Sequence, residues 1–301
     1  MNLEINEKKI LILGAQGNLG SQIAREMQLD SKSVISWSRE DCDLCDLYEA
    51  KTKIRKLAPD IIINTVAYNN VDACEKDLKE QSKAILLNIE LVGCLAQICH
   101  KMNIKLIHFS TNYVFSGNKE SYTEYDEPDP INFYGITKAL GEKLILSKLE
   151  SGLNACIIRV SNLFGPRGNS VNSKESFFDV IRNAAHKNNC LSVVNDEICC
   201  FTYTKDIAKQ LVNRINDENF QGIYHWVNSG SASWYEATQV YFELLNYSNT
   251  LKPIGGSAYG RPAKRPASAI LCTTRSSALR HYKLALQEYI NDSAVTSSQN
   301  E

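Results

Sequence analysis

The sequence predicts an α/β fold in which a doubly wound, parallel sheet is joined to a smaller, mixed C-terminal region. Two observations lead to this fold class. Through the first half of the chain, short apolar runs alternate with longer amphipathic stretches, as in βαβ units whose helices connect parallel strands. After residue 160 the alternation becomes irregular, so we expect a region of different construction there.

The elements follow one another in a simple order. Apolar runs predict strands at 10–13, 33–37, 60–64, 104–109 and 155–159. Apolar residues at helical spacing predict helices at 18–27, 47–57, 82–102 and 133–149. Residues 112–131, rich in Gly, Asn, Pro and acidic side chains, are predicted to form a loop. In the second half we expect helices at 176–185, 203–216 and 234–245 and a strand at 222–226.

The bulk composition is that of an ordinary globular protein. The 301 residues are 44% hydrophobic and 22% charged, with a formal net charge of -1. Near-neutral charge gives no electrostatic reason to expect nucleic acid or an anionic membrane surface as a partner. No apolar run approaches the roughly 18 residues of a membrane span, and the charged start does not resemble a signal peptide. We therefore expect a cytoplasmic protein with no nucleic-acid or membrane partner.

Ten cysteines are many for such a chain, but their spacing indicates no disulfide framework. Cys42 and Cys45 form a lone C-x-x-C pair, which a redox centre or half of a zinc site would also show. No second ligand pair follows at zinc spacing. We expect reduced thiols that pack as small hydrophobic groups, and no metal site.

A glycine-rich turn joins the first predicted strand to the first predicted helix. Its G-x-x-G-x-x-G spacing varies the G-x-G-x-x-G fingerprint of dinucleotide-binding folds. Glycines permit the tight turn and let backbone N–H groups approach a diphosphate at the helix N-terminus. We expect a dinucleotide to be bound there by Gly14, Gln16, Gly17, Asn18, Leu19 and Gly20.

The turn and the alternation together define the expected domains. Residues 1–160 are expected to form a dinucleotide-binding Rossmann domain. Residues 161–291 are expected to form mainly a substrate-binding region, with some segments returning to the Rossmann sheet. The polar residues 292–301 are expected to form a frayed tail.

The second predicted strand ends on residues that bear on the choice of cofactor. An acidic residue there would bind the ribose 2′-hydroxyl of NADH, but the chain has Ser38 and Arg39, followed by Glu40. A hydroxyl and a guanidinium fork suit a 2′-phosphate, although Arg39 could instead be a solvated loop residue. We predict NADPH, with Glu40 keeping NADH open as an alternative.

Tyr134 and Lys138 lie four residues apart on a predicted helix and are therefore stacked neighbours. The Lys138 ammonium beneath the phenol is expected to lower the pKa of Tyr134 toward the range of an acid–base catalyst. Ser110 and Thr111 follow an apolar run, and a hydroxyl there can hydrogen-bond a carbonyl oxygen that Tyr134 protonates. The spacing is common by chance, so its weight depends on the hydride donor that the glycine turn implies.

Several segments together resemble one enzyme superfamily. The glycine turn, Ser110-Thr111-Asn-Tyr-Val-Phe-Ser-Gly117 and Tyr134-Gly-Ile-Thr-Lys138 are similar to motifs of the extended short-chain dehydrogenase/reductases. Within that superfamily the chain looks like the dTDP-4-dehydrorhamnose reductases. Further matching segments are 59–64, 67–72, 132–142, 222–228 and 265–271, so the resemblance covers most of the length.

The resemblance implies an NADPH-dependent enzyme that reduces the C4 ketone of a nucleotide-activated deoxy sugar, such as dTDP-4-dehydrorhamnose to dTDP-rhamnose, for cell-surface polysaccharide precursors. Thr111 would orient the carbonyl group, Tyr134 would donate the proton, and Lys138 would also bind the nicotinamide ribose. The other implied cofactor contacts are Ser38, Arg39, Asp43, Leu44, Ala67, Tyr68 and Asn88. The implied sugar contacts are Tyr113, Asn132, Asn162 and Arg265.

The chain departs from the family pattern at three places. Asn112 stands where the family usually has Asp, Asn162 stands where it has a Trp near the sugar, and 197–201 lacks the usual Gly and Pro. These changes leave the hydride chemistry intact but bear on which sugar is bound. Two alternatives stay open: an epimerase or dehydratase of the same superfamily, and a non-catalytic regulatory subunit similar to the methionine adenosyltransferase β subunit. A homodimer is a further expectation.

Overall fold

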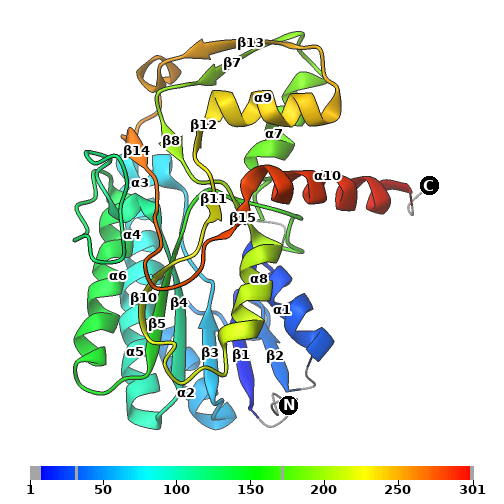
Figure 1. Ribbon diagram of the computed structural model, residues 1–301. Coiled ribbons are helices and arrows are strands. Elements are labelled where there is room, and N and C mark those ends of the chain that lie inside the picture. Colours follow the sequence, from blue (N-terminus) through cyan, green and yellow to red (C-terminus); the bar gives the residue numbers. More distant parts are fainter. Residues whose placement is uncertain (1–7, 31–32, 171–172, 299–301) are drawn as a thin grey trace.

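The computed structural model describes residues 8–30, 33–170 and 173–298, and its larger part is a doubly wound α/β fold (Figure 1). Six strands form one sheet in the order β10-β5-β4-β3-β1-β2, and every neighbouring pair is parallel. These strands are β1 (Ile10–Leu13), β2 (Val34–Trp37), β3 (Ile61–Asn64), β4 (Lys105–Thr111), β5 (Ala155–Val160) and β10 (Gly222–His225). The predicted fold class is confirmed.

Helices cover both faces of this sheet. They are α1 (Asn18–Asp30), α2 (Leu47–Leu57), α5 (Leu91–Met102), α6 (Phe133–Leu149) and α8 (Thr204–Arg214). Alternate side chains of a strand point to opposite faces: Ile10 and Ile12 belong to the core that includes residues of α1 and α8, and Leu11 and Leu13 belong to the core that includes residues of α2, α5 and α6. The two cores hold the sheet rigidly, with the carboxyl ends of its strands facing the smaller lobe (Figure 1).

One helix is longer than predicted and is continuous from Leu78 to Met102. Its segments are α4 (Leu78–Ile85), a π-helical turn η2 (Leu86–Glu90) and α5. By length and composition alone this helix could cross a membrane, although a helix buried in a protein core passes the same test. Half of its most apolar window is buried, and Leu91 and Leu95 pack in the core between helix and sheet. Helix α3 (Val71–Lys76), which has 6 residues, was not predicted.

The smaller lobe lies above the carboxyl ends of the sheet strands (Figure 1). Its main elements are α7 (Phe177–Ala185), α9 (Trp234–Leu245), α10 (Tyr282–Ser298) and the parallel pair of β7 (Cys190–Val194) and β13 (Thr250–Ile254). Ser176 and Ser233 begin α7 and α9 with capping boxes, in which the serine and an acidic residue three positions later satisfy each other's backbone N–H groups. A separate core, rich in aromatic side chains such as Phe178 and Tyr241, holds this lobe together.

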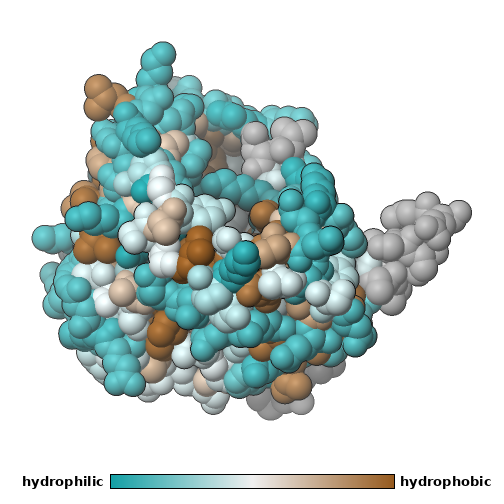
Figure 2. All heavy atoms as spheres, turned by 90° about the horizontal axis from the view of Figure 1, so that it is seen from above, coloured by the Kyte–Doolittle hydropathy of each residue, from teal (hydrophilic) through white to brown (hydrophobic). Residues whose placement is uncertain are grey.

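Short elements complete the described structure. They are β6 (Leu163–Phe164) with β9 (Thr202–Tyr203), β8 (Ile198–Cys199) with β12 (Ala232–Ser233) and β14 (Ser268–Ala269), β11 (Asn228–Ser229) with β15 (Leu279–His281), and the 3-10 turns η3 (Asn112–Val114) and η4 (Gly256–Tyr259). Helix α10 continues past Asp292, where a frayed tail was expected, to Ser298. The division into domains stays a prediction. On the face seen from above, hydrophobic residues form separate small patches (Figure 2).

Candidate active site

A cleft of about 1100 Å³ lies between the carboxyl ends of the strands and the smaller lobe. This is where open, parallel sheets bind their ligands. Its volume exceeds the roughly 300–1,000 Å³ of a pocket for one small molecule. The lining comes from both lobes, from Ser38 at one end to Trp234 at the other. The cleft is therefore large for a ligand site, and both lobes line it.

The glycine turn forms the floor of this cleft, and all six residues predicted there line it. Gly14 has φ +78°, a left-handed conformation that side chains disfavour. A Cβ on Gly20 would lie 2.2 Å from the carbonyl oxygen of Gly14, so the turn can close on α1 only without a side chain there. The N-terminal N–H groups of α1 are thereby brought to the cleft, where they favour an anionic ligand.

The residues predicted for the adenine end also line the cleft: Ser38, Arg39, Asp43 and Leu44. The Arg39 side chain is 73% exposed, and its Nε lies 3.8 Å from Asp43 Oδ1, so the guanidinium is free to turn toward a phosphate. Glu40, the residue that kept NADH open, is not among the lining residues. Cys42 and Cys45 are free thiols, and the described residues contain no metal-binding group of His, Cys, Asp and Glu.

Thr111, Tyr134 and Lys138 meet at the centre of the cleft, from the end of β4 and the first turns of α6. Tyr134 is 8% exposed, and burial raises its pKa well above the ordinary value, while a hydrogen bond with the Thr111 side chain opposes part of that rise. Tyr113 packs its ring edge against Tyr134, with centroids 5.8 Å apart. The phenol therefore keeps its proton at neutral pH.

Lys138 does not lie beneath the Tyr134 hydroxyl, so the expected lowering of the Tyr134 pKa is wrong for this structure. The Lys138 Nζ instead donates to the carbonyl oxygen of Phe109 at 2.8 Å and lies 3.2 Å from His108 Nε2. Helical spacing brings two Cα atoms to one face but does not direct the end of a long side chain. A buried amine turns to the nearest acceptors, here on β4.

The hydrogen bonds around His108 define the protonation of this cluster. Asn64 Oδ1 accepts from the backbone N–H of Val66, so its Nδ2 donates to His108 Nδ1, at 3.0 Å. Burial lowers the pKa of His108 far below its ordinary value, so the ring is neutral and its one proton is on Nε2. That proton faces Lys138 Nζ, which can accept it only as a neutral amine. Burial lowers the pKa of Lys138 to about 8, so the amine is mostly protonated at neutral pH and becomes an acceptor only above about pH 8.

Three predicted site residues are not among those that line the cleft. Asn88, in the π-helical turn, holds the backbone of Tyr68 with two hydrogen bonds of 2.9 Å. Asn132 caps α6 by accepting from Gly135 N and donates to the carbonyl of Lys264. These two side chains support the cleft wall from behind.

Arg265, the third of these residues, holds Asp72 with both arms of its guanidinium, at 2.5 and 2.7 Å. It also hydrogen-bonds Tyr113, so it links the segment between η4 and β14 to the site. The remaining predicted residues, Ala67, Tyr68, Tyr113 and Asn162, do line the cleft.

The two departures near the catalytic set have local physical reasons. Asn112 donates through its amide to the carbonyl of Ala269, at 3.5 Å, which an aspartate could not do. Asn162 has φ +30°, a left-handed conformation that asparagine tolerates better than bulkier residues.

Several lining residues were not predicted, above all Lys174, Phe177 and Trp234 from the smaller lobe. The Phe177 and Trp234 rings pack edge to face, with centroids 4.6 Å apart. The capping serines mark where their helices start, but no pattern in the sequence shows that these helix starts face the glycine turn.

Comparison with known proteins agrees with this geometry. A model of the RmlD substrate binding domain family matches residues 8–295. The spore coat polysaccharide biosynthesis protein SpsK of Bacillus subtilis is 31% identical, over 94% of this chain and 97% of that protein. A dTDP-4-dehydrorhamnose reductase of Mycolicibacterium smegmatis is 30% identical, over 96% of this chain and 86% of that protein.

Solved structures extend the comparison. The crystal structure of a dTDP-4-dehydrorhamnose reductase from Bacillus anthracis in complex with NADP has a TM-score of 0.86 and 27% identity, covering 95% of this chain and 99% of that one. The UDP-glucose 4-epimerase of Thermus thermophilus, in complex with NAD, has a TM-score of 0.70 at 18% identity, covering 93% and 92%. The latter likeness shows a shared fold alone.

Proposed function

This chain belongs to the RmlD substrate binding domain family, and we propose that it is an NADPH-dependent reductase of a nucleotide-linked 4-keto deoxy sugar. The relatives named dTDP-4-dehydrorhamnose reductase make reduction of dTDP-4-dehydrorhamnose to dTDP-rhamnose the first candidate reaction. The observation that carries the proposal is that Thr111, Tyr134 and Lys138 line one cleft together with the glycine turn.

The residues present fit a bound NADP(H). The glycine turn leaves backbone N–H groups open to a diphosphate. Arg39 can bind a 2′-phosphate, and we propose that Lys138 binds the nicotinamide ribose. When bound, NADPH supplies the hydride.

The environment of Tyr134 supports this residue as the source of the proton. Because burial raises its pKa, the phenol is protonated and can act as the general acid. A ketone oxygen between the two hydroxyls would accept a hydrogen bond from Thr111 and the proton from Tyr134. As the ketone oxygen gains charge during hydride addition, these two donors stabilise it. Each residue thereby has one role: Thr111 orients the carbonyl group, Tyr134 donates the proton, and Lys138 binds the nicotinamide ribose.

The experiment is an NADPH oxidation assay with dTDP-4-keto-6-deoxy sugars made by a 4,6-dehydratase and an epimerase. We expect turnover by the wild type and a loss of at least about 100-fold in Tyr134→Phe, with NADPH binding retained. Tyr125→Phe is the matched control, because Tyr125 is 78% exposed.

Other outcomes would overturn the proposal. Failure to oxidise NADPH with dTDP-, UDP-, GDP- and CDP-linked keto sugars would exclude a sugar reductase. Isomerisation without net NADPH consumption would identify an epimerase. Co-purification with a synthetase, and no sugar activity, would favour a regulatory subunit.

We further propose that the protein acts in the cytoplasm, where nucleotide sugars are made. Its nucleotide-sugar substrate follows from the proposed reaction. A homodimer stays a prediction that a mass measurement in solution decides.

A further inference from the structure

A strap from the smaller lobe rests on the glycine turn. We use this name for residues 167–170 and 173–176, which follow β6. The backbone N–H of Gly168 donates to Asn18 Oδ1 at 3.0 Å. The backbone N–H of Ser170 and the hydroxyl of Ser173 both donate to the carbonyl oxygen of Gln16, at 3.0 and 3.1 Å. The strap therefore uses acceptors that belong to the dinucleotide turn itself.

The contact between strap and turn is as close as backbones permit. A Cβ on Gly168 would lie 2.3 Å from the carbonyl oxygen of Gln16 and 2.5 Å from the carbonyl carbon of Gly17. Asn18 also donates through Nδ2 to the carbonyl of Lys174, at 2.8 Å. These contacts fix the backbone of Lys174 at the rim of the cleft, next to the start of α1.

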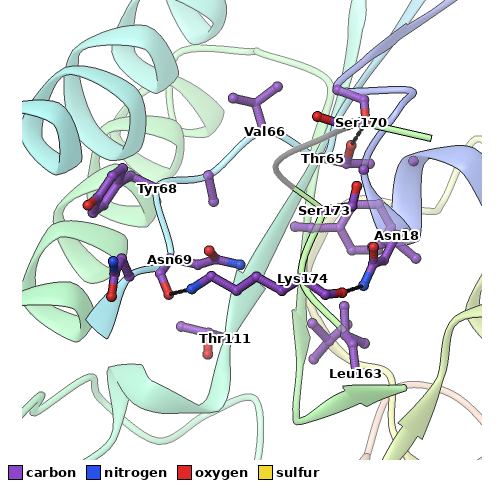
Figure 3. Close-up of a pocket in the computed structure, with 18 of the residues that line it drawn as sticks. Asn18, Thr65, Val66, Tyr68, Asn69, Thr111, Leu163, Ser170, Ser173 and Lys174 are labelled. Atoms are coloured by element: carbon purple, nitrogen blue, oxygen red, sulfur yellow. Dashed lines mark hydrogen bonds between the residues drawn. The ribbon is translucent and has the colours of Figure 1, made fainter. Parts of the chain in front are cut away.

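From this rim the Lys174 side chain crosses the cleft. Figure 3 shows it extending from Asn18 to Asn69 on the opposite wall, with Thr111 below it in this view. There its Nζ donates to the carbonyl oxygen of Asn69, at 3.1 Å. In the described part of the chain no carboxylate lies within ion-pair distance of Lys174, whereas Arg265 and Arg261, on the same side of the molecule, each have one.

The charge of Lys174 is thus directed into a ligand cleft and matched only by a backbone carbonyl. Phosphate oxygens are stronger partners for an ammonium than a neutral carbonyl, because both groups are charged. The nearby N-terminus of α1 favours anions too. A ligand with adjacent phosphates could bind both the ammonium and this helix start.

We propose that Lys174 binds the diphosphate of a nucleotide in this cleft and exchanges the carbonyl of Asn69 for a phosphate oxygen. The inference rests on the proposed function, which supplies two diphosphates: that of the dinucleotide and that of the sugar nucleotide. The Lys174 amine lies at Asn69, across the cleft from the glycine turn, and this position favours the diphosphate of the sugar nucleotide. Lys174 is therefore a residue that selects a nucleoside diphosphate over an uncharged ligand.

The test measures binding directly, by calorimetry with NADPH, dTDP and thymidine as separate probes. Lys174→Met removes the charge at similar length, and Lys174→Arg keeps it. Lys187→Met, at an exposed lysine of the same lobe, is the matched control. One charge-assisted hydrogen bond corresponds to about 10–100-fold in affinity. We expect Lys174→Met to weaken dTDP binding by that factor, to leave thymidine unchanged, and Lys174→Arg to restore most of the loss.

The separate probes show which of the two diphosphates Lys174 binds. They also separate a failure of this proposal from a failure of the proposed function. Loss for dTDP with NADPH unchanged assigns Lys174 to the sugar nucleotide, and loss for NADPH alone assigns it to the dinucleotide. Affinities for both probes within twofold of Lys187→Met would overturn the proposal. If the wild type binds dTDP and NADPH but turns over no keto sugar, the proposed function is wrong. The effect of Lys174→Met on binding can still be measured in that case.

Discussion

The lowered pKa of Lys138 predicts how the free energy of unfolding changes with pH. Measuring this change tests the Asn64–His108–Lys138 cluster. In this fully buried site the pKa of Lys138 falls from 10.5 to about 8 because burial disfavours its charged form. One pKa unit is worth about 1.36 kcal/mol, so the ammonium form destabilises the folded protein by about 3 kcal/mol. Lys138→Met removes this group and its titration.

The sign follows from proton binding in the two states. Below pH 8 Lys138 is protonated in both the folded and the unfolded chain, and the full cost is present. Between pH 8 and 10.5 the unfolded chain binds a proton that the folded chain does not, so the free energy of unfolding of the wild type rises relative to Lys138→Met. Across this window we expect the difference between the two proteins to change by about 3 kcal/mol.

The assay is urea unfolding of both proteins at several values between pH 7 and 10.5, compared as a difference so that other titrating groups cancel. His108 and Tyr134 do not interfere, because burial lowers the pKa of His108 far below the window and raises the pKa of Tyr134 above it. Lys143→Met, an exposed lysine on the same helix, should show a flat difference. If Lys138→Met also gave a flat difference, Lys138 would stay charged in the folded protein up to pH 10.5, and the lowered pKa of this buried amine would be refuted.

Two further predictions concern the cofactor and the core. Arg39→Ser should weaken NADPH binding by about 10–100-fold, the value of one charge-assisted hydrogen bond, and leave NADH unchanged; equal losses in a fluorescence titration with both cofactors would refute a 2′-phosphate contact. Glu142 and Arg159 form an ion pair whose side chains are 1% and 0% exposed. Glu142→Gln should lower the free energy of unfolding by about 3–5 kcal/mol, because it leaves the guanidinium buried and unpaired, whereas a loss under 1 kcal/mol in urea would show that Arg159 finds another partner.

The sheet and its main helices could be predicted because their signals are local. Each strand of the sheet is a short run of apolar residues, and α2, α6 and α9 begin and end at the predicted residues. Elements of two or three residues, such as β6 and β9, carry no such signal, because each exists only through the partner that the fold brings beside it. Helix α3 was missed for the same reason of length.

The features of the site also divide into those with a local signal in the sequence and those that depend on tertiary contacts. The glycine turn and the Thr111, Tyr134 and Lys138 set were predictable, since their residue types and spacing carry the chemistry. The direction of the Lys138 amine was not, because it depends on His108 and Phe109 of a neighbouring strand. The support of Tyr68 by Asn88 likewise depends on contacts between residues distant in the sequence.

By itself the sequence determined the fold class, the dinucleotide turn and the residues with catalytic chemistry, because backbone periodicity and residue type are properties of the chain alone. Only the tertiary structure decided which charges are buried, where long side chains end and what faces the cleft from the smaller lobe. Lys174 shows the difference most clearly. Nothing around it in the sequence marks a ligand site, yet the fold carries its amine across the cleft to Asn69 (Figure 3).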